Sequence, residues 1–210
     1  MNVLSPRAAR IHGVATILAP LLLLASSLAY VLVGGGINNG VWGGILGAWS
    51  ALAFVVAFAG IGRVVEPAAP RAAPVVAGIA LVGWATGIGF QTNAMYTALR
   101  GDDLLFDASE GENAVILLAF LPWGWFAPLG FVLLGWLLWR TGLGARWQAA
   151  LLVLGGVLFL VGYPAQIAAA ALASNVAVVL AVVPLGYAIL TGTFGAVDRP
   201  SERPSTQVAG

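Results

Sequence analysis

The 210-residue chain has no cysteine, no lysine and a single histidine, His12. The absence of cysteine excludes disulfides, thiolate catalysis and iron–sulfur clusters. A single histidine cannot provide the two axial ligands of a bis-histidine haem within one chain, and protein metal sites usually need three or four ligands. We therefore predict no cofactor and no metal, and we expect His12 to anchor the first helix at a membrane interface.

Charge is scarce as well. Nine basic and eight acidic residues make up 8% of the chain, whereas 60% of its residues are apolar. A soluble domain of this size would expose roughly 9,000 Å² of surface. That leaves roughly 540 Å² for each charge, as much as the largest apolar patch of a typical soluble monomer. A soluble globule is therefore excluded, and so is a disordered chain, which would be poor in apolar residues. A polytopic membrane protein remains.

The charged residues are separated by four long uncharged segments, 11–62, 72–99, 113–139 and 147–197. Because a membrane-spanning helix needs about 20 apolar residues, each middle segment holds one helix. Each outer segment holds two helices, with a turn rich in Gly, Asn or Pro near its centre. We predict an all-α bundle of six transmembrane helices, at residues 12–33, 42–62, 75–99, 114–139, 146–162 and 167–190. We expect Pro128 to bend the fourth helix.

The bundle is predicted to form one domain over residues 1–196. The remaining residues, 197–210, have a polar, proline-containing composition that cannot bury a core, and are predicted to be a disordered tail.

The arginines predict the orientation of this bundle. In a six-span topology eight of them lie on one side, whereas Arg100 lies alone on the other side with five acidic residues. Cytoplasmic loops carry the excess of positive charge in membrane proteins. Both termini and the tail are therefore predicted to be cytoplasmic, with the acidic 100–113 loop outside.

Two local patterns have alternative interpretations. The first apolar segment resembles a secretory signal with a cleavage site at Ser27-Leu28-Ala29, but it continues to Val33, which favours a retained span. The acidic segment 107–113 resembles a calcium loop. The spacing of this segment does not match the motif. Counted from Asp107, the motif needs Gly at position 6 and Glu at position 12, but Gly111 is at position 5. A solvated acidic loop is the simpler prediction.

Small residues recur every four positions at 43–51, 83–89 and 169–181. Such stripes let helix backbones approach closely, which is the usual packing device in membranes. They predict a compact bundle, and their partner is either a helix of the same chain or a second copy in a homo-oligomer.

Uncharged polar groups are concentrated in the outer half of the predicted spans. At about 1.5 Å per residue, Gln91 and Asn93 lie roughly 6–9 Å outside the midpoint of the third span. One interpretation is an outward-facing vestibule that binds a small ligand or a lipid headgroup. The other is that these groups hydrogen-bond one another between helices. The candidate vestibule residues are Gln91, Asn93, Trp123, Trp125 and Asn175.

Residues 130–147, which include Trp139-Arg140-Thr141-Gly142 and Arg146-Trp147, and the following Leu154-Gly155-Gly156 resemble a group of bacterial six-span membrane proteins of unknown function. The opening residues 9–13 fit the same group. Where that group usually has proline before its Arg-Trp pair, this chain has Ala145. The resemblance implies six spans and no particular activity. A bias toward Ala, Gly and Arg without lysine is typical of G+C-rich bacterial genomes, so we expect a bacterial cytoplasmic membrane.

We predict an integral membrane protein without an evident catalytic site, which binds a small apolar or amphipathic molecule or a partner membrane protein. The alternative is a small-molecule permease that uses the vestibule. Apart from Arg146 at the first residue of the fifth, the predicted spans contain no Asp, Glu, Arg or Lys, which disfavours proton coupling. An enzyme acting on lipid would need a buried acid–base pair, which the sequence does not provide. The expected partners are the lipid bilayer, a small ligand and a second copy of the chain, and not nucleic acid.

Reporter fusions test the predicted topology. A fusion at residue 105 and one at residue 210 are separated by three predicted spans, so they should report opposite sides of the membrane. Alkaline phosphatase and fluorescent-protein activities in cells would measure this. Two fusions on the same side would overturn the six-span count.

Overall fold

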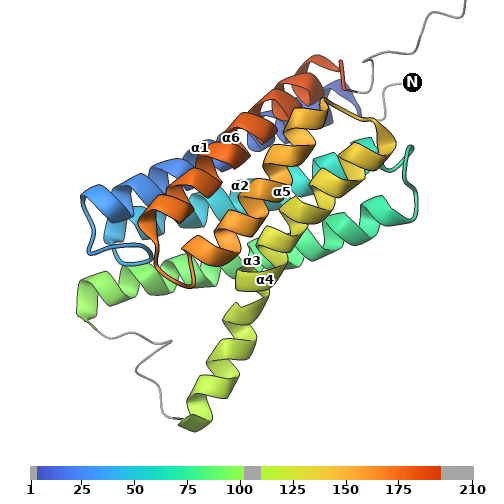
Figure 1. Ribbon diagram of the computed structural model, residues 1–210. Helices are drawn as coiled ribbons and strands as arrows, with labels where there is room; N and C mark the ends of the chain where they lie inside the picture. The colour runs from blue at the N-terminus through green and yellow to red at the C-terminus, as the bar shows by residue number, and fades with distance from the viewer. Residues whose placement is uncertain (1–3, 102–109, 195–210) are drawn as a thin grey trace, which may run out of the picture.

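The computed structural model describes residues 4–101 and 110–194, and it describes side chains there except at 110–121. These residues form six α-helices and no β-strand (Figure 1). Each predicted span coincides with one helix, which confirms the all-α prediction. The helices are α1 (Pro6–Leu32), α2 (Val41–Val65), α3 (Ala72–Arg100), α4 (Glu110–Thr141), α5 (Arg146–Gly162) and α6 (Ala168–Thr191).

Five of the helices are long and apolar enough to cross a membrane: α1, α2, α3, α6 and the Pro122–Thr141 part of α4. The chain is therefore a multi-pass membrane protein by the length and composition of its helices. With 17 residues, α5 is about 26 Å long, which is less than the roughly 30 Å of a bilayer's hydrocarbon core. The acidic residues 102–109 and the predicted tail at 197–210 lie outside the described residues.

The helices form a closed ring in chain order. Each packs against its neighbours in sequence, and α6 packs against α1 to complete the ring. Short turns at residues 33–40, 66–71, 142–145 and 163–167 reverse the chain between the helices that they join. Between α4 and α5 the chain reverses with Gly142 and Gly144 in the left-handed region (φ 69° and 75°), which glycine adopts without strain.

Because the helices alternate in direction, Arg100 at the end of α3 lies at one end of the bundle and the other six described arginines lie at the opposite end. Figure 1 shows the start of α1, the end of α6 and the α2–α3 and α4–α5 turns at this end. We call it the basic end. Its described arginines are Arg7, Arg10, Arg63, Arg71, Arg140 and Arg146.

Prolines interrupt three of the helices. Pro20 lies in α1, Pro184 in α6, and Pro122 and Pro128 in α4. Figure 1 shows that the amino-terminal part of α4 leaves the bundle at an angle to the rest of the helix. Proline removes a backbone hydrogen bond and its ring displaces the preceding turn, so the two prolines of α4 account for this bend.

Aromatic rings from α2 to α5 pack in a continuous column inside the ring of helices. Phe54 stacks on Trp84 with ring centroids 4.0 Å apart, and Trp84 meets Phe159 edge to face at 6.5 Å. Trp123 then contacts Phe159 at 5.3 Å and stacks on Phe90 at 4.1 Å. Such offset and edge-to-face pairs are the favoured arrangements of aromatic rings. This aromatic column consists of Phe54, Phe58, Trp84, Phe90, Trp123, Phe131, Phe159 and Tyr163.

One glycine stripe of α3 faces this interior, whereas Gly89 of the other stripe is exposed. A Cβ atom at Gly83 would overlap the backbone of Ala127 on α4, and one at Gly87 would overlap the indole of Trp123. These glycines therefore serve contacts between helices of the same chain, by allowing α3 and α4 to approach closely.

Candidate functional site

A buried cluster of hydrogen-bonded side chains joins the first helix, α1, to the last two, α5 and α6. The Asn175 side-chain amide on α6 donates to the Ser27 hydroxyl on α1 at 2.7 Å and to the Tyr163 hydroxyl after α5 at 3.1 Å. The Ser27 and Tyr163 hydroxyls are 2.8 Å apart. All three side chains are buried, so each polar atom depends on the others for its hydrogen bonds.

A second buried pair connects α1 to α3. The Tyr30 hydroxyl donates to the Gln91 side-chain carbonyl at 2.5 Å. Two glycines of α2 make room for these side chains, because a Cβ at Gly43 would overlap the Tyr30 ring and one at Gly47 the Gln91 amide. Tyr30 follows Ser27 by three residues, so both groups of hydrogen bonds begin on the same part of α1.

Three serine hydroxyls bond to the backbone of a neighbouring helix. Ser26 donates to the Gly43 carbonyl at 2.7 Å, and Ser50 donates to the Ala19 carbonyl at 2.8 Å, so α1 and α2 are tied in both directions. Ser174 ties α6 to α5 through the Gly155 carbonyl at 2.7 Å. In a membrane such contacts between helices are worth about 0.6 kcal/mol each.

The structure brings some of the predicted vestibule residues together. Tyr163 bonds to Asn175 and lies edge to face with Trp123 at 5.7 Å. Gln91 is buried against Tyr30, and Asn93 is buried on α3. The Trp125 side chain is 59% exposed on the surface of α4, away from this interior.

Sequence reasoning missed the two tyrosines that organise the interior. A tyrosine near the end of a span is normally assigned to the membrane interface, yet Tyr30 is fully buried and Tyr163 is 3% exposed. The available signal was the short spacing of Tyr30 from Ser26 and Ser27, which puts three hydroxyls on neighbouring turns of one helix.

His12 makes a helix contact. Its Nδ1–H donates to the Val56 carbonyl of α2 at 2.8 Å, and its ring lies against Gly60. Among the residues that the structure describes, no group of three His, Cys, Asp or Glu side chains could hold a metal ion.

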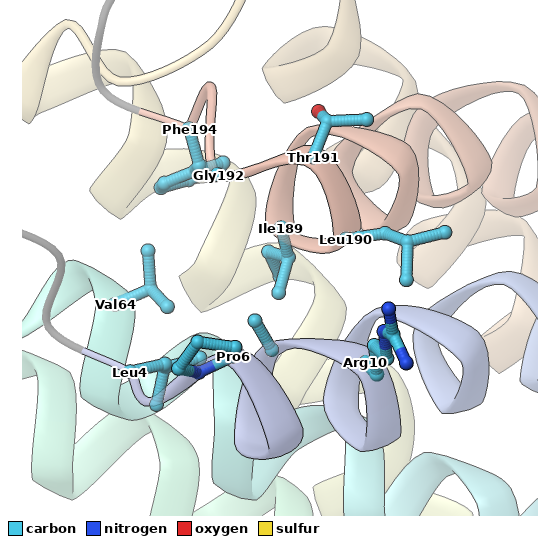
Figure 2. Close-up of a pocket in the computed structure, with 10 residues that line it drawn as sticks. Leu4, Pro6, Arg10, Val64, Ile189, Leu190, Thr191, Gly192 and Phe194 are labelled. Atoms are coloured by element: carbon cyan, nitrogen blue, oxygen red, sulfur yellow. The ribbon is translucent and has the colours of Figure 1, made fainter.

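A cavity of about 350 Å³ opens at the basic end between α1, α2 and α6 (Figure 2). Most of its lining residues are apolar, although polar and apolar atoms contribute about equally to its surface. Figure 2 shows the Arg10 side chain at one side of it, below Leu190 of α6. No sequence pattern predicted this cavity, because its walls come from segments far apart in the chain. The lining residues are Leu4, Pro6, Ala9, Arg10, Val64, Ile189, Leu190, Thr191, Gly192 and Phe194.

Comparisons with protein-family models, with curated proteins and with solved structures gave no match to this chain.

The tyrosine cluster can be tested by stability. Tyr163→Phe removes the hydroxyl that Ser27 and Asn175 share, so it should lower the free energy of unfolding by about 1 kcal/mol. Unfolding of the purified protein in mixed micelles with increasing SDS would measure this. Tyr187→Phe is the matched control, since that side chain is 63% exposed. Equal stability of the two variants would contradict the role assigned to Tyr163.

Proposed function

We propose that the chain is a six-span protein of a bacterial cytoplasmic membrane with both termini in the cytoplasm. The arginines gathered at one end of the bundle support this orientation, because positive charge accumulates on the cytoplasmic side. The antiparallel packing of α5 between α4 and α6 supports the sixth span. Local thinning of the bilayer accommodates a short span at modest cost.

Within that arrangement, the protein binds a small amphipathic anion with a single hydrocarbon chain in the cavity at the basic end. The observation that carries this proposal is the roughly 350 Å³ volume, which falls in the range of ligand sites, combined with a single arginine among mostly apolar lining residues. A long-chain fatty acid has this chemistry.

The contacts follow from the lining. The hydrocarbon chain packs against Leu4, Val64 and Phe194, and the carboxylate pairs with the Arg10 guanidinium. In the part of the chain that the structure describes, Arg10 has no acidic partner. Guanidinium groups bind carboxylates with two parallel hydrogen bonds, which fixes the orientation of the ligand.

Fatty-acid binding tests this function. The protein in nanodiscs should bind a fluorescent polyene fatty acid, and unlabelled palmitate should displace it. Arg10→Gln should weaken binding about fivefold, which corresponds to about 1 kcal/mol for a solvent-exposed ion pair. Arg7→Gln is the matched control, because Arg7 is exposed on the same helix and does not line the cavity.

A second variant separates the volume of the cavity from its charge. Ala9→Phe fills the cavity and keeps Arg10, so it should also reduce binding. Binding that is unchanged in both Arg10→Gln and Ala9→Phe would show that the fatty acid lies elsewhere.

A permease for small uncharged solutes is the second candidate, with the interior residues Gln91, Asn93, Trp123 and Asn175 along its path; Trp125, exposed on the surface of α4, is not part of it. One observation favours it. The indole N–H groups of Trp84 and Trp123 are buried without an acceptor among the described residues. Such donors suit a neutral solute that offers oxygen acceptors.

Solute flux tests the permease. Proteoliposomes should take up glycerol or urea faster than protein-free liposomes, and joint replacement of Gln91 and Asn93 by Leu should abolish the difference. Arg100, which lies over the Tyr96 ring at 5.7 Å on the same helix, provides the control variant Arg100→Gln. Equal flux with and without the wild-type protein would exclude this candidate for the solutes tested.

A further inference from the structure

A second hollow lies between α4 and α5. It has a volume of about 480 Å³ and contains neither a hydroxyl, an amide nor a charged side chain in its lining. We call it the α4–α5 groove. It is lined by Gly135, Trp136, Trp139, Ala149, Ala150, Val153, Leu154 and Val157.

Small residues create this groove and large ones border it. A Cβ at Gly135 would lie 2.6 Å from the Ala149 carbonyl oxygen, so the two helices touch at that level. Trp136 and Leu154 stand beside the contact with 47% and 48% of their surfaces exposed. The result is an apolar groove that runs along the two helices on the outer surface of the helix ring.

Two arginines lie beside the groove at the basic end of the bundle. The Arg140 guanidinium lies over the Trp136 ring, 5.5 Å from its centroid. The Arg146 guanidinium at the start of α5 lies over the Trp139 ring of α4 at 5.8 Å. Attraction between a cation and the face of an aromatic ring holds each guanidinium next to the groove.

No acidic residue close in sequence neutralises the positive charge of these two arginines. Between Glu112 and Asp198 the chain has no acidic residue. The turn between the two arginines is Thr-Gly-Leu-Gly-Ala, and its two left-handed glycines keep it short, so both guanidinium groups stay at the same end of the groove. Basic sites between helices on the cytoplasmic side of a membrane suit anionic lipid headgroups.

We propose that the α4–α5 groove is a binding site for one anionic phospholipid of the cytoplasmic leaflet. One acyl chain lies in the groove between Trp136, Trp139 and Val153, and Arg140 and Arg146 bind the phosphate. This proposal rests on the proposed membrane orientation, and it concerns a different surface from the fatty-acid cavity. A free phosphate ion lacks the chain that the groove accepts, and a zwitterionic lipid lacks the net charge that two arginines select.

Native mass spectrometry of the detergent-solubilised protein tests the proposal. With equal amounts of phosphatidylglycerol and phosphatidylcholine added, the wild-type protein should retain one phosphatidylglycerol in preference. Joint replacement Arg140→Gln and Arg146→Gln should weaken this binding about thirtyfold. Arg71→Gln, a single exposed arginine of the same end between α2 and α3, should leave it unchanged. Arg10→Gln should also leave it unchanged, which separates this site from the fatty-acid cavity.

A variant that keeps both charges tests the acyl chain. Ala150 is exposed in the groove, so Ala150→Phe fills the groove from outside without entering the core, and it should also displace the lipid. Glycerol phosphate, which carries the headgroup charge without a chain, should not compete with the lipid.

Several results would overturn the proposal. These are equal retention of the two lipids, an equal loss of binding in Arg71→Gln, or competition by glycerol phosphate. A dimer that Ala150→Phe dissociates, without any dependence on phosphatidylglycerol, would assign the groove to a second copy of the chain. Because the measurement is made in detergent, it does not depend on the topology assay, so failure of the proposed orientation and failure of the lipid site are distinguishable.

Discussion

The side-chain amide of Asn175 holds the two ends of the helix ring together, because it donates both to Ser27 on α1 and to Tyr163 at the end of α5. Lipid tails are as apolar as leucine, so burial of apolar surface does not drive one membrane helix against another. Close packing and hydrogen bonds between helices must do so instead. The contact of α6 with α1 closes the ring, and this contact in turn shapes the cavity that Arg10 shares with α6.

The interior and the surface of the bundle differ in chemistry. Inside, the aromatic column fills the ring, Tyr30 bonds to Gln91, and Ser174 bonds to a backbone carbonyl of α5. The described charged groups lie at or near the helix ends, with Arg10 at the cavity and Arg140 and Arg146 beside the α4–α5 groove. An uncharged, packed interior with charge at one rim suits a protein that binds amphipathic molecules at its periphery more than one that moves ions through its centre.

Much of the fold could be predicted from the sequence, because the positions of the charged residues bracket the helices. The segment between Arg71 and Arg100, for example, is α3 almost residue for residue. The site was harder to predict. Gln91 and Asn175 could be recognised as polar residues in apolar spans, but their partners Tyr30 and Tyr163 could not, because pairing depends on which helices become neighbours. The cavity beside Arg10 and the α4–α5 groove depend on the ring's closure and on helix crossings, which local patterns do not encode.

Because of the aromatic column, the tryptophans of the protein fall into two groups with different spectroscopic properties. Trp84 and Trp123 are buried within it, whereas Trp42, Trp49, Trp125, Trp136, Trp139 and Trp147 are each about half exposed or more. The two interior indoles stack on phenylalanine rings in a rigid, chiral setting. Near-ultraviolet circular dichroism of this protein therefore reports the packing of the ring's centre. Its fluorescence intensity comes mainly from the six exposed indoles, so the two signals follow different parts of the same molecule.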